Sequence, residues 1–446
     1  MNITRRRVLS LAATLATTAL FATGCAPGTA GGSGGTLRVL IGANAKYGDK
    51  YKTWQRDVAE KFKQSTGADL EFETYAAASD ELTTIQTSVV SGQGPDVYHI
   101  GSTFTPTAYS TGAFVKFDAA QWEKVGGRDR FVPASLGISG PDLDNEVGVP
   151  FTSRPYVLAY NTEIFEKAGL GKPADTWDGL LAQAKKLTDG DTYGFATGYA
   201  DNFSPWKFIW TLANQLGNTI VDGTVVRVDD PAVQSAYETY FGWLSKDQVI
   251  NPAAAGWNDA QAAVDFAAGK SAMMLMTTVN ATPTFEEGAI KGKYAFATMP
   301  TVAPGQTAPA VDGRDVTSII SGDNLAIADY SQKKDLAAEY VKLVTSEEEQ
   351  LKYNKLFGDL PTNAAAAKKV QDSLPSLAPL LASAEKSKST PFTGAWGDIQ
   401  LALTNIVVQS RQDLAKGGVS ESALKSALEK AQQESQASLN RATGTK

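Results

Sequence analysis

Short apolar runs and longer amphipathic segments alternate along most of the chain. The run TLRVLIG at 36–42 predicts a buried strand that ends at a glycine. In the segment that follows, Trp54, Val58 and Phe62 stand four residues apart, which is the spacing of one face of a helix. Two further strands with a helix between them are expected by residue 101. Strands separated by helices favour a parallel sheet with helices on both faces, and therefore an α/β fold.

The same alternation resumes later in the sequence. EVGVPFTSRPYVLAYN at 146–161 predicts two strands around a polar turn, and SAMMLM at 271–276 predicts another buried strand. Amphipathic segments predict several helices, one of which has Thr176 as its expected N-cap. The chain after residue 398 is expected to be helical almost to its end.

The first 24 residues have the order of a bacterial export signal, in which basic residues precede an apolar run. Arg5, Arg6 and Arg7 stand before an apolar run that is too short and too rich in threonine to span a membrane. Three adjacent arginines fit both a twin-arginine signal and a general secretory signal, so both routes stay open. We therefore expect residues 1–24 to be a signal peptide.

The single cysteine of the 446 residues, Cys25, directly follows this signal. The sequence ATGC resembles the lipobox of bacterial lipoproteins, in which the cysteine sulfur is acylated, although Ala22 stands where a leucine is usual. The residues that follow are mostly small, with too little apolar content to fold. Residues 25–35 are thus expected to form a lipidated anchor and a flexible tether.

Composition narrows the chemistry that the folded part can perform. The net charge of −7 argues against a nucleic-acid partner. One cysteine excludes an internal disulfide, and one histidine, His99, excludes the ligand clusters of zinc or copper sites. We expect no metal and no cofactor, and we expect His99 to be a packed or capped imidazole at the end of a strand.

Four segments carry a family resemblance through their order and spacing. They are SGQGPDVYHIGSTFTPTAYSTGAFVKFD at 91–118, GVPFTSRPYVLAYNTEIFEKAGLGKPADTWDGLLAQAKKLT at 148–188, AVDFAAGKSAMML at 263–275 and LPTNAAAA at 360–367. Together they resemble the extracellular solute-binding proteins of sugar-importing ABC transporters, the maltose-binding-like group. The resemblance runs from about Thr36 to about Leu428.

This resemblance implies a two-lobed periplasmic-binding-protein type II fold, in which a hinge joins two α/β lobes. Lobe 1 is expected to comprise residues 36–147 with 301–360, and lobe 2 residues 148–300 with 361–440. The corresponding crossings are placed near Val147–Pro150, Met299–Thr301 and Leu360–Pro361.

The resemblance also implies that a sugar binds between the lobes, at the carboxyl ends of sheet strands. Sugar hydroxyls need paired donors and acceptors, and sugar C–H faces stack on aromatic rings. The expected ligand contacts are Asp80, Thr103, Phe104, Arg154, Asp201, Asn202, Trp206, Trp257, Asn258, Asp323 and Trp396.

Several of these residues have competing structural roles. Asp80 can stabilise a helix dipole, Asn258 can cap a helix, Arg154 can form a surface ion pair, and Trp396 can pack in the core. The tryptophan that relatives often place after the AMML strand is absent, so either a stacking ring is missing there or Phe285 replaces it. The remaining tryptophans of helical stripes and caps are expected in the core: Trp122, Trp177 and Trp243.

The function implied is that of an extracellular substrate-binding lipoprotein of an ABC sugar importer. It would bind an oligosaccharide between its lobes and deliver it to membrane permease subunits, which act with an ATPase, when the lobes close. It is expected to be a monomer, lipid-anchored through Cys25 to the extracellular face of the cytoplasmic membrane. No catalytic residue is expected.

Two alternatives remain. A lipid-anchored glycoside hydrolase needs two facing carboxylates, and among the 48 acidic residues no spacing stands out. GGSGG at 31–35 matches a nucleophile-elbow motif in letters only, because it lies in the expected tether. A binding protein for a non-sugar solute, such as a peptide, is the other alternative.

Overall fold

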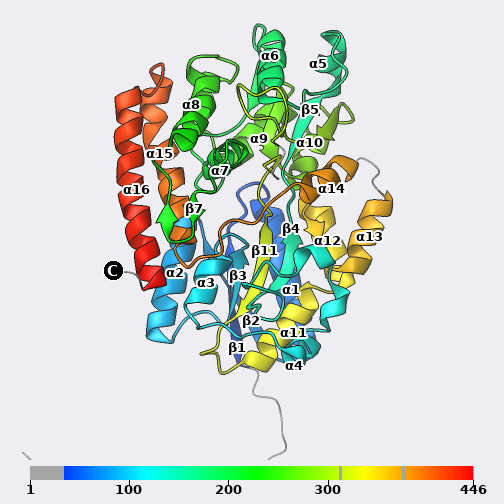
Figure 1. Ribbon diagram of the computed structural model, residues 1–446. Helices are drawn as coiled ribbons and strands as arrows, with labels where there is room; N and C mark the ends of the chain where they lie inside the picture. Colours follow the sequence, from blue (N-terminus) through cyan, green and yellow to red (C-terminus); the bar gives the residue numbers. More distant parts are fainter. Residues whose placement is uncertain (1–34, 311–313, 374–376, 445–446) are drawn as a thin grey trace, which may run out of the picture. The chain divides into compact units, whose positions relative to one another are not determined.

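The computed structural model describes residues 35–310, 314–373 and 377–444. The expected signal peptide and Cys25 lie outside the described residues. Among the described helices, none is both long and apolar enough to cross a membrane. The described chain forms two main β-sheets with helices packed against them (Figure 1), and a short ribbon of β7 (Val221–Asp222) and β8 (Val225–Val226).

The first sheet has six strands in the order β12–β4–β11–β3–β1–β2. β1 pairs in parallel with β2 and β3, as the alternation of strands and helices predicted, whereas β11 runs antiparallel to β3 and β4. Successive side chains point to opposite faces, so that Val39 packs in one core cluster and Leu40 in another. The strands are β1 Thr36–Gly42, β2 Asp69–Tyr75, β3 Val97–Gly101, β4 Val149–Ser153, β11 Gly322–Ile327 and β12 Leu360–Pro361.

Helices cover both faces of this first sheet, which forms the first lobe. The predicted stripe of Trp54, Val58 and Phe62 is confirmed, because all three are buried on α1 in the core of one face. Leu82 and Ile85 of α2 pack against the opposite face. The helices are α1 Gly48–Thr66, α2 Ala78–Ser91, α3 Thr105–Ser110, α4 Ala119–Lys124, α11 Lys334–Val344, α12 Glu347–Phe357 and α13 Ala364–Ser373.

The second sheet has four strands in the order β10–β5–β9–β6 and forms the second lobe. β9 is fully buried and pairs in parallel with β6 and antiparallel with β5. Leu158 of β5 faces one core cluster, and its neighbours Val157 and Ala159 face another. The strands are β5 Val157–Asn161, β6 Tyr193–Ala196, β9 Ser271–Thr277 and β10 Tyr294–Ala297.

The second lobe carries the remaining helices. Thr176 is confirmed as the N-cap of α6, since its hydroxyl oxygen accepts the Gly179 N–H at 3.0 Å. The long C-terminal helices α15 and α16 pack against each other and against α8 (Figure 1). The helices are α5 Thr162–Lys167, α6 Trp177–Leu187, α7 Pro205–Gln215, α8 Pro231–Ser245, α9 Asp259–Ala267, α10 Thr282–Glu287, α14 Ala378–Glu385, α15 Trp396–Ala415 and α16 Glu421–Thr443.

The first crossing between the lobes lies later than Val147–Pro150, where the sequence placed it. β4 belongs to the first sheet, because it pairs with β11 and β12. The chain therefore enters the second lobe only between Ser153 and Val157.

The other two crossings are also displaced from their predicted positions. Beyond Met299–Thr301 the chain stays on the second lobe, where Val316 packs in the core and the Thr317 hydroxyl donates to the Ser383 carbonyl at 2.8 Å. It returns to the first lobe at Gly322. β12 is a strand of the first sheet, and α13 after it packs on α12 and β12, so the final crossing comes between α13 and α14.

A glycine is required where two crossing segments meet. A Cβ on Gly322 would lie 2.0 Å from the carbonyl oxygen of Thr152. The Arg154 N–H donates to the Ser321 carbonyl at 2.9 Å just beyond this contact. The two crossing segments therefore run in direct backbone contact at the base of the lobes.

The expected core tryptophans Trp122, Trp177 and Trp243 are buried, and Trp396 is buried with them. Trp396 is 0% exposed, and its ring meets that of Trp206 edge-on at 5.7 Å. It lies in the core of the second lobe at the start of α15. Trp396 therefore packs in the core and does not face the cleft.

We predict that Trp396→Ala lowers the free energy of unfolding by about 3–5 kcal/mol, because it removes a fully buried indole and leaves a cavity. Urea denaturation followed by circular dichroism measures the effect. Trp396→Phe keeps a ring in the same place and should lose less. An unchanged unfolding curve for Trp396→Ala would contradict this placement.

Candidate functional site

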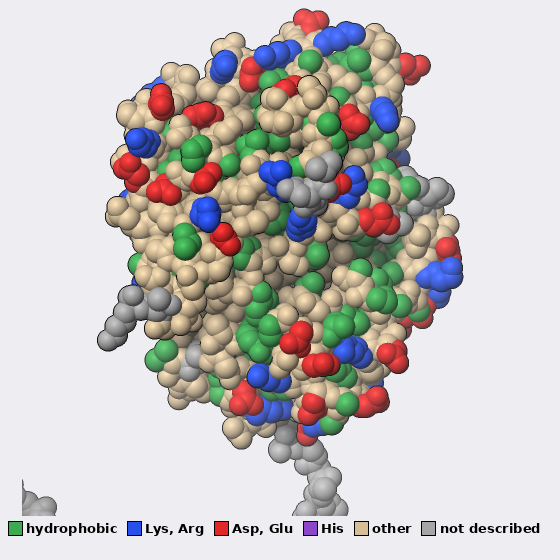
Figure 2. Space-filling model, viewed as in Figure 1, with side chains coloured by type: hydrophobic (Ala, Val, Ile, Leu, Met, Phe, Trp, Pro, Cys, Tyr) green, Lys and Arg blue, Asp and Glu red, His purple; other side chains and the backbone are tan. Residues whose placement is uncertain are grey.

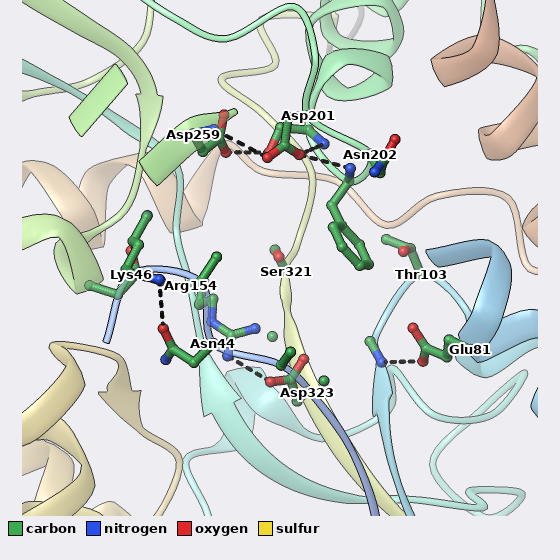
Figure 3. Close-up of a pocket in the computed structure, with 18 of the residues that line it drawn as sticks. Asn44, Lys46, Glu81, Thr103, Arg154, Asp201, Asn202, Asp259, Ser321 and Asp323 are labelled. Carbon is green, nitrogen blue, oxygen red and sulfur yellow. Dashed lines mark hydrogen bonds and ion pairs between the residues drawn. The ribbon is translucent and has the colours of Figure 1, made fainter. Parts of the chain in front are cut away.

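A cleft of about 310 Å³ lies between the two sheets and is lined by residues from both lobes. The first lobe contributes the segment after β1, the segment after β3 and the start of α2, and the second lobe contributes the segments before α7 and α9. β1 and β3 end at this cleft, which is where open α/β sheets bind ligands. Figure 3 shows Asp201, Asn202 and Asp259 facing Glu81 and Thr103 across it.

An ion cluster forms the floor of the cleft. The Arg154 guanidinium donates to both carboxylate oxygens of Asp359, from Nε and from Nη2, at 2.9 Å each. Its Nη2 also donates to Asp323 Oδ2 at 2.6 Å. Burial alone would raise the pKa of Asp323, but the guanidinium outweighs burial and holds that pKa below its usual range. Arg154 thus pairs with two protein carboxylates through Nε and Nη2, and its Nη1 forms no hydrogen bond found among the described residues.

Glu81 of α2 is the buried carboxyl on the first-lobe side. It is 2% exposed, and its Oε1 accepts the Gly101 N–H at 3.2 Å. Burial raises the pKa of Glu81 to about 8, against the lowering effect of that N–H and of the neighbouring Tyr75 hydroxyl. Glu81 is therefore mostly protonated at pH 7 and can donate a hydrogen bond into the cleft.

Two carboxylates face the cleft from the second lobe. Asp201 Oδ1 accepts the N–H groups of Phe203 and Ser204 at 2.8 Å each, and its Oδ2 accepts the Asp259 N–H at 3.2 Å. The Ser204 hydroxyl donates to Asp259. Burial raises the pKa of Asp259 to about 6, and the adjacent Asp201 charge adds to the increase. These contacts hold both carboxylates in fixed positions at the rim.

The cations of the cleft lie beside these groups. The Lys46 ammonium donates to Asn280 Oδ1 at 3.2 Å and so bridges the lobes. The Lys207 ammonium sits 4.9 Å from the centre of the Tyr156 ring. Neither cation forms one of the ion pairs found among the described residues.

The structure brings most of the predicted contacts together at this one cleft. Eight of them line it: Thr103, Phe104, Arg154, Asp201, Asn202, Trp206, Asn258 and Asp323. Asn258 lines it while also capping α9, because its Oδ1 accepts the Gln261 N–H at 3.0 Å.

Three predicted contacts do not line the cleft. Asp80 is exposed, and its carboxylate accepts the Ala77 N–H at 3.2 Å, which is the helix-terminus role. Trp396 is in the core, as described above. Trp257 lines a neighbouring cavity instead. Phe285 is fully buried and packs on Phe266, so it supplies no stacking ring to the cleft.

The sequence missed several residues that line the cleft. Glu81 adjoins the predicted Asp80. It stands four residues before the buried Ile85, which is the spacing of one helix face and was a usable signal that Glu81 points inward. Phe203 lines the cleft and is 36% exposed. Trp206, which is only 3% exposed, was instead predicted from the sequence as the aromatic ligand contact of this segment. Lys46, Asp259 and Gln400 also line the cleft, and the Gln400 carboxamide oxygen is buried without a partner among the described residues.

His99 lines the cleft from β3 and is a packed imidazole, as expected. Its Nε2 pairs with the Tyr340 hydroxyl at 2.7 Å, and its ring lies 4.9 Å from that of Phe151. Burial lowers the pKa of His99 to about 3, so it is neutral at physiological pH. Among the described residues, no cluster of His, Cys, Asp and Glu has the arrangement of a metal site.

We predict that Glu81 lowers stability as pH rises. An unfolded chain ionises this residue near pH 4.5, whereas the folded protein keeps it protonated to about pH 8. Folding therefore binds a proton here, and the free energy of unfolding falls between these pH values. Glu81→Gln removes this titration. The thermal midpoint of the variant minus that of the wild type should therefore increase from pH 4 to pH 8 and stay constant above pH 8.

The control for this measurement is Glu71→Gln, which changes an exposed glutamate on β2 and should parallel the wild type. Thermal unfolding at intervals from pH 4 to pH 9 gives all three curves. Parallel curves for Glu81→Gln and the wild type would show that Glu81 is not a buried neutral carboxyl.

Comparisons with known proteins agree with the two-lobed architecture. The chain is 27% identical over 381 residues to the diacetylchitobiose binding protein DasA of Streptomyces coelicolor, covering 84% of each chain. Its structure matches an ABC transporter solute binding protein of Thermotoga lettingae bound with α-D-tagatose, with a TM-score of 0.74 at 20% identity over 91% of this chain and 99% of that chain.

A second solved structure, the maltose-bound MalE3 of T. maritima, matches with a TM-score of 0.73 at 19% identity over 90% of this chain and 99% of that one. These likenesses confirm the predicted two-lobed type II fold. The model of the family of bacterial extracellular solute-binding proteins matches residues 44–351, which is more than half of the sequence. This chain belongs to the bacterial extracellular solute-binding protein family.

Proposed function

We propose that this protein is the substrate-binding component of an ABC sugar importer. It binds an oligosaccharide in the cleft between its lobes and delivers it to the membrane permease when the lobes close around it. The observation that carries the proposal is the cleft lined from both lobes, in which planar polar groups surround a partly exposed aromatic ring.

The chemistry of the cleft suits a polyhydroxylated, uncharged ligand. Glu81 and Lys207 offer donors, Asp201 and Asp259 offer acceptors, and Asn202 offers both. Asp201, Asn202 and Asp259 lie on the opposite side of the hollow from Glu81 (Figure 3). Phe203 presents a half-exposed ring on which the C–H face of a sugar can stack.

Contacts across the cleft mouth support closure as the delivery step. Tyr47 of the first lobe donates its hydroxyl to the Asn280 carbonyl of the second at 2.6 Å. Lys50 pairs with Glu287 at 2.8 Å, and Lys46 reaches the Asn280 side chain. Since a ligand that touches both lobes favours the state in which these contacts form, binding and closure are coupled.

The names of the relatives support a sugar ligand and a binding role. DasA is named for diacetylchitobiose, and the two solved structures hold tagatose and maltose. We infer that this chain also binds without catalysis, because the relatives that it matches are named as binding proteins.

The surface and the leader support a lipid-anchored protein outside the cytoplasm. On the face shown in Figure 2, acidic and basic side chains are interspersed over most of the surface. We propose that Cys25 carries the lipid and that the protein works as a monomer tethered to the membrane.

The test is thermal unfolding of the purified protein against diacetylchitobiose, maltose, maltotriose, tagatose and ribitol, with dipeptides and amino acids beside them. A ligand that binds only the folded form stabilises it by about 2.7 kcal/mol at a hundredfold excess over its dissociation constant. A shift with one sugar that is recovered intact supports the proposal. A shift with a peptide alone refutes the sugar ligand, and cleavage of a sugar refutes the binding role.

We predict that Phe203→Ala weakens binding of that sugar by up to about tenfold, because it removes a stacking contact of about 0.5–1.5 kcal/mol. Isothermal titration calorimetry measures the affinity. Phe392→Ala is the matched control, since Phe392 is 39% exposed but does not line the cleft. Equal affinities of all three proteins would contradict the role of Phe203.

We predict that Cys25→Ser moves the protein from the membrane fraction to the soluble fraction, because the serine hydroxyl cannot replace the acylated sulfur. Fractionation of expressing bacteria followed by immunoblotting measures the distribution. Ser33→Ala, in the same segment, should stay in the membrane fraction. A Cys25→Ser variant that remains with the membrane would rule out the anchor.

A further inference from the structure

The start of α15 in the second lobe packs against α2 and α3 of the first lobe. Thr107 of α3 is 6% exposed, and its hydroxyl makes two hydrogen bonds between the lobes. It donates to the Gly394 carbonyl at 3.0 Å and accepts the Gly397 N–H at 3.2 Å. The first N–H groups of a helix have no partner within that helix, so the first lobe satisfies one that α15 leaves open. These three residues define the α3–α15 contact.

The two lobes approach each other closely at the α3–α15 contact. A Cβ on Gly397 would lie 2.9 Å from Thr107 Oγ1 and 3.3 Å from Leu82 Cδ1. Both distances are shorter than an ordinary van der Waals contact, so a glycine is required there. Leu82 is itself buried in a core cluster of the first lobe. A close-packed contact with buried hydrogen bonds resists gradual separation.

The α3–α15 contact is also joined to the crossing segments. The Ile320 N–H donates to the carbonyl of Lys388, in the segment that leads to α15, at 2.9 Å, and the Lys388 N–H donates to the Ser318 carbonyl at 3.0 Å. From the first lobe, the hydroxyl of Ser102, which lies between β3 and α3, donates to the Ile320 carbonyl at 3.3 Å. Hydrogen bonds thus tie this flank of the cleft to its floor.

A different set of contacts holds the opposite flank. Figure 3 shows Lys46 on one side of Ser321 and Thr103 on the other. α3 begins at Thr105, so the α3–α15 contact lies on the Thr103 side. We call the other side the Lys46 flank.

The contacts on the Lys46 flank come from side chains that solvent reaches more easily. Lys46 and Tyr47 donate to Asn280, and Lys50 pairs with Glu287. The side chains of this ion pair are 45% and 69% exposed, and such a pair contributes about 0–1 kcal/mol. Holding a lysine side chain in one conformation also costs entropy. This flank therefore separates more easily than the α3–α15 contact.

The backbones of the two lobes also meet on the Lys46 flank, at Gly358 and Val279. A Cβ on Gly358 would lie 2.5 Å from the Val279 carbonyl oxygen. Among the described residues, however, no hydrogen bond joins these two backbones. They can therefore part without leaving a broken backbone hydrogen bond.

We propose that the α3–α15 contact persists when the lobes separate and that, with the crossing segments, it is the pivot of the motion. The second lobe then turns about a line from Ser321 to Thr107. The cleft opens on the Lys46 flank, and the ligand enters and leaves there. The inference rests on the proposed function, because it specifies how the closure that delivers the ligand takes place.

Double electron–electron resonance between spin labels tests the pivot. The full chain with Cys25→Ser has no other cysteine, so labels can be placed in chosen pairs. Asp49→Cys with Glu286→Cys spans the Lys46 flank, and both positions are exposed. Thr87→Cys with Arg441→Cys joins exposed positions of α2 and α16 on the other flank. We expect a broad distance distribution with a longer component for the first pair and a single narrow distribution for the second.

Variants at the α3–α15 contact give the second readout. Thr107→Val removes both hydrogen bonds and keeps a side chain of similar volume, and Gly397→Ala inserts a methyl group between the lobes. Each should broaden the distribution of the second pair. Thr111→Val is the matched control, because the Thr111 hydroxyl bonds only within the first lobe, and it should match the parent protein.

The outcomes separate this inference from the proposed function, because the distances can be measured without a sugar. Distributions of equal width for the two pairs, whether broad or narrow, overturn the pivot. A second-pair distribution that stays unchanged in both Thr107→Val and Gly397→Ala overturns it as well. Unequal distributions in a protein that binds none of the sugars in the thermal-unfolding panel support the pivot while the sugar-binding function fails.

Discussion

The Arg154 guanidinium holds together the place where the two lobes meet. It follows β4 at the first crossing, and it binds Asp323 at the start of β11 and Asp359 just before β12. One side chain thereby joins three segments that are far apart in sequence. Breaking a buried pair of this kind by removing one partner costs about 3–5 kcal/mol, because it leaves an uncompensated charge. This cluster ties the three segments together at the floor of the cleft, and we propose that ligand recognition falls to the groups on its walls.

The carboxyl groups of the cleft are arranged so that little free negative charge reaches a ligand. Asp323 and Asp359 share one arginine, and Glu81 keeps its proton until about pH 8. Asp201 and Asp259 accept hydrogen bonds from backbone and serine groups of their own lobe. With Lys46 and Lys207 nearby, the walls offer directed hydrogen bonds without a strong net field. We propose that such a surface selects a ligand by the geometry of its hydroxyl groups and not by its charge.

Local patterns in the sequence predicted the elements, and the family resemblance predicted most of the residues that line the cleft. Neither predicted the relations between distant segments. The stripe of α1 and the cap at Thr176 depend on near neighbours and were found. The crossings depend on strand pairing between β4 and β11, more than 160 residues apart, so they were misplaced. Arg154 was placed in the cleft, but its two partners lie 169 and 205 residues away and no local signal shows them.

The second feature that the sequence could not predict is the direction in which a side chain points. Asp80 and Glu81 are adjacent on α2, and a helix turns about 100° per residue, so one points to solvent and the other into the cleft. Trp396 is the first residue of α15 and follows a loop. At such a position the sequence pattern does not show whether the indole points to the ligand or to the core.

A crystal structure with the tightest-binding sugar tests the central claim most directly. The account predicts sugar density between Phe203 and Glu81, with Arg154 still bound to Asp323 and Asp359. Density elsewhere, or an arginine that leaves both carboxylates to bind the sugar, would contradict it.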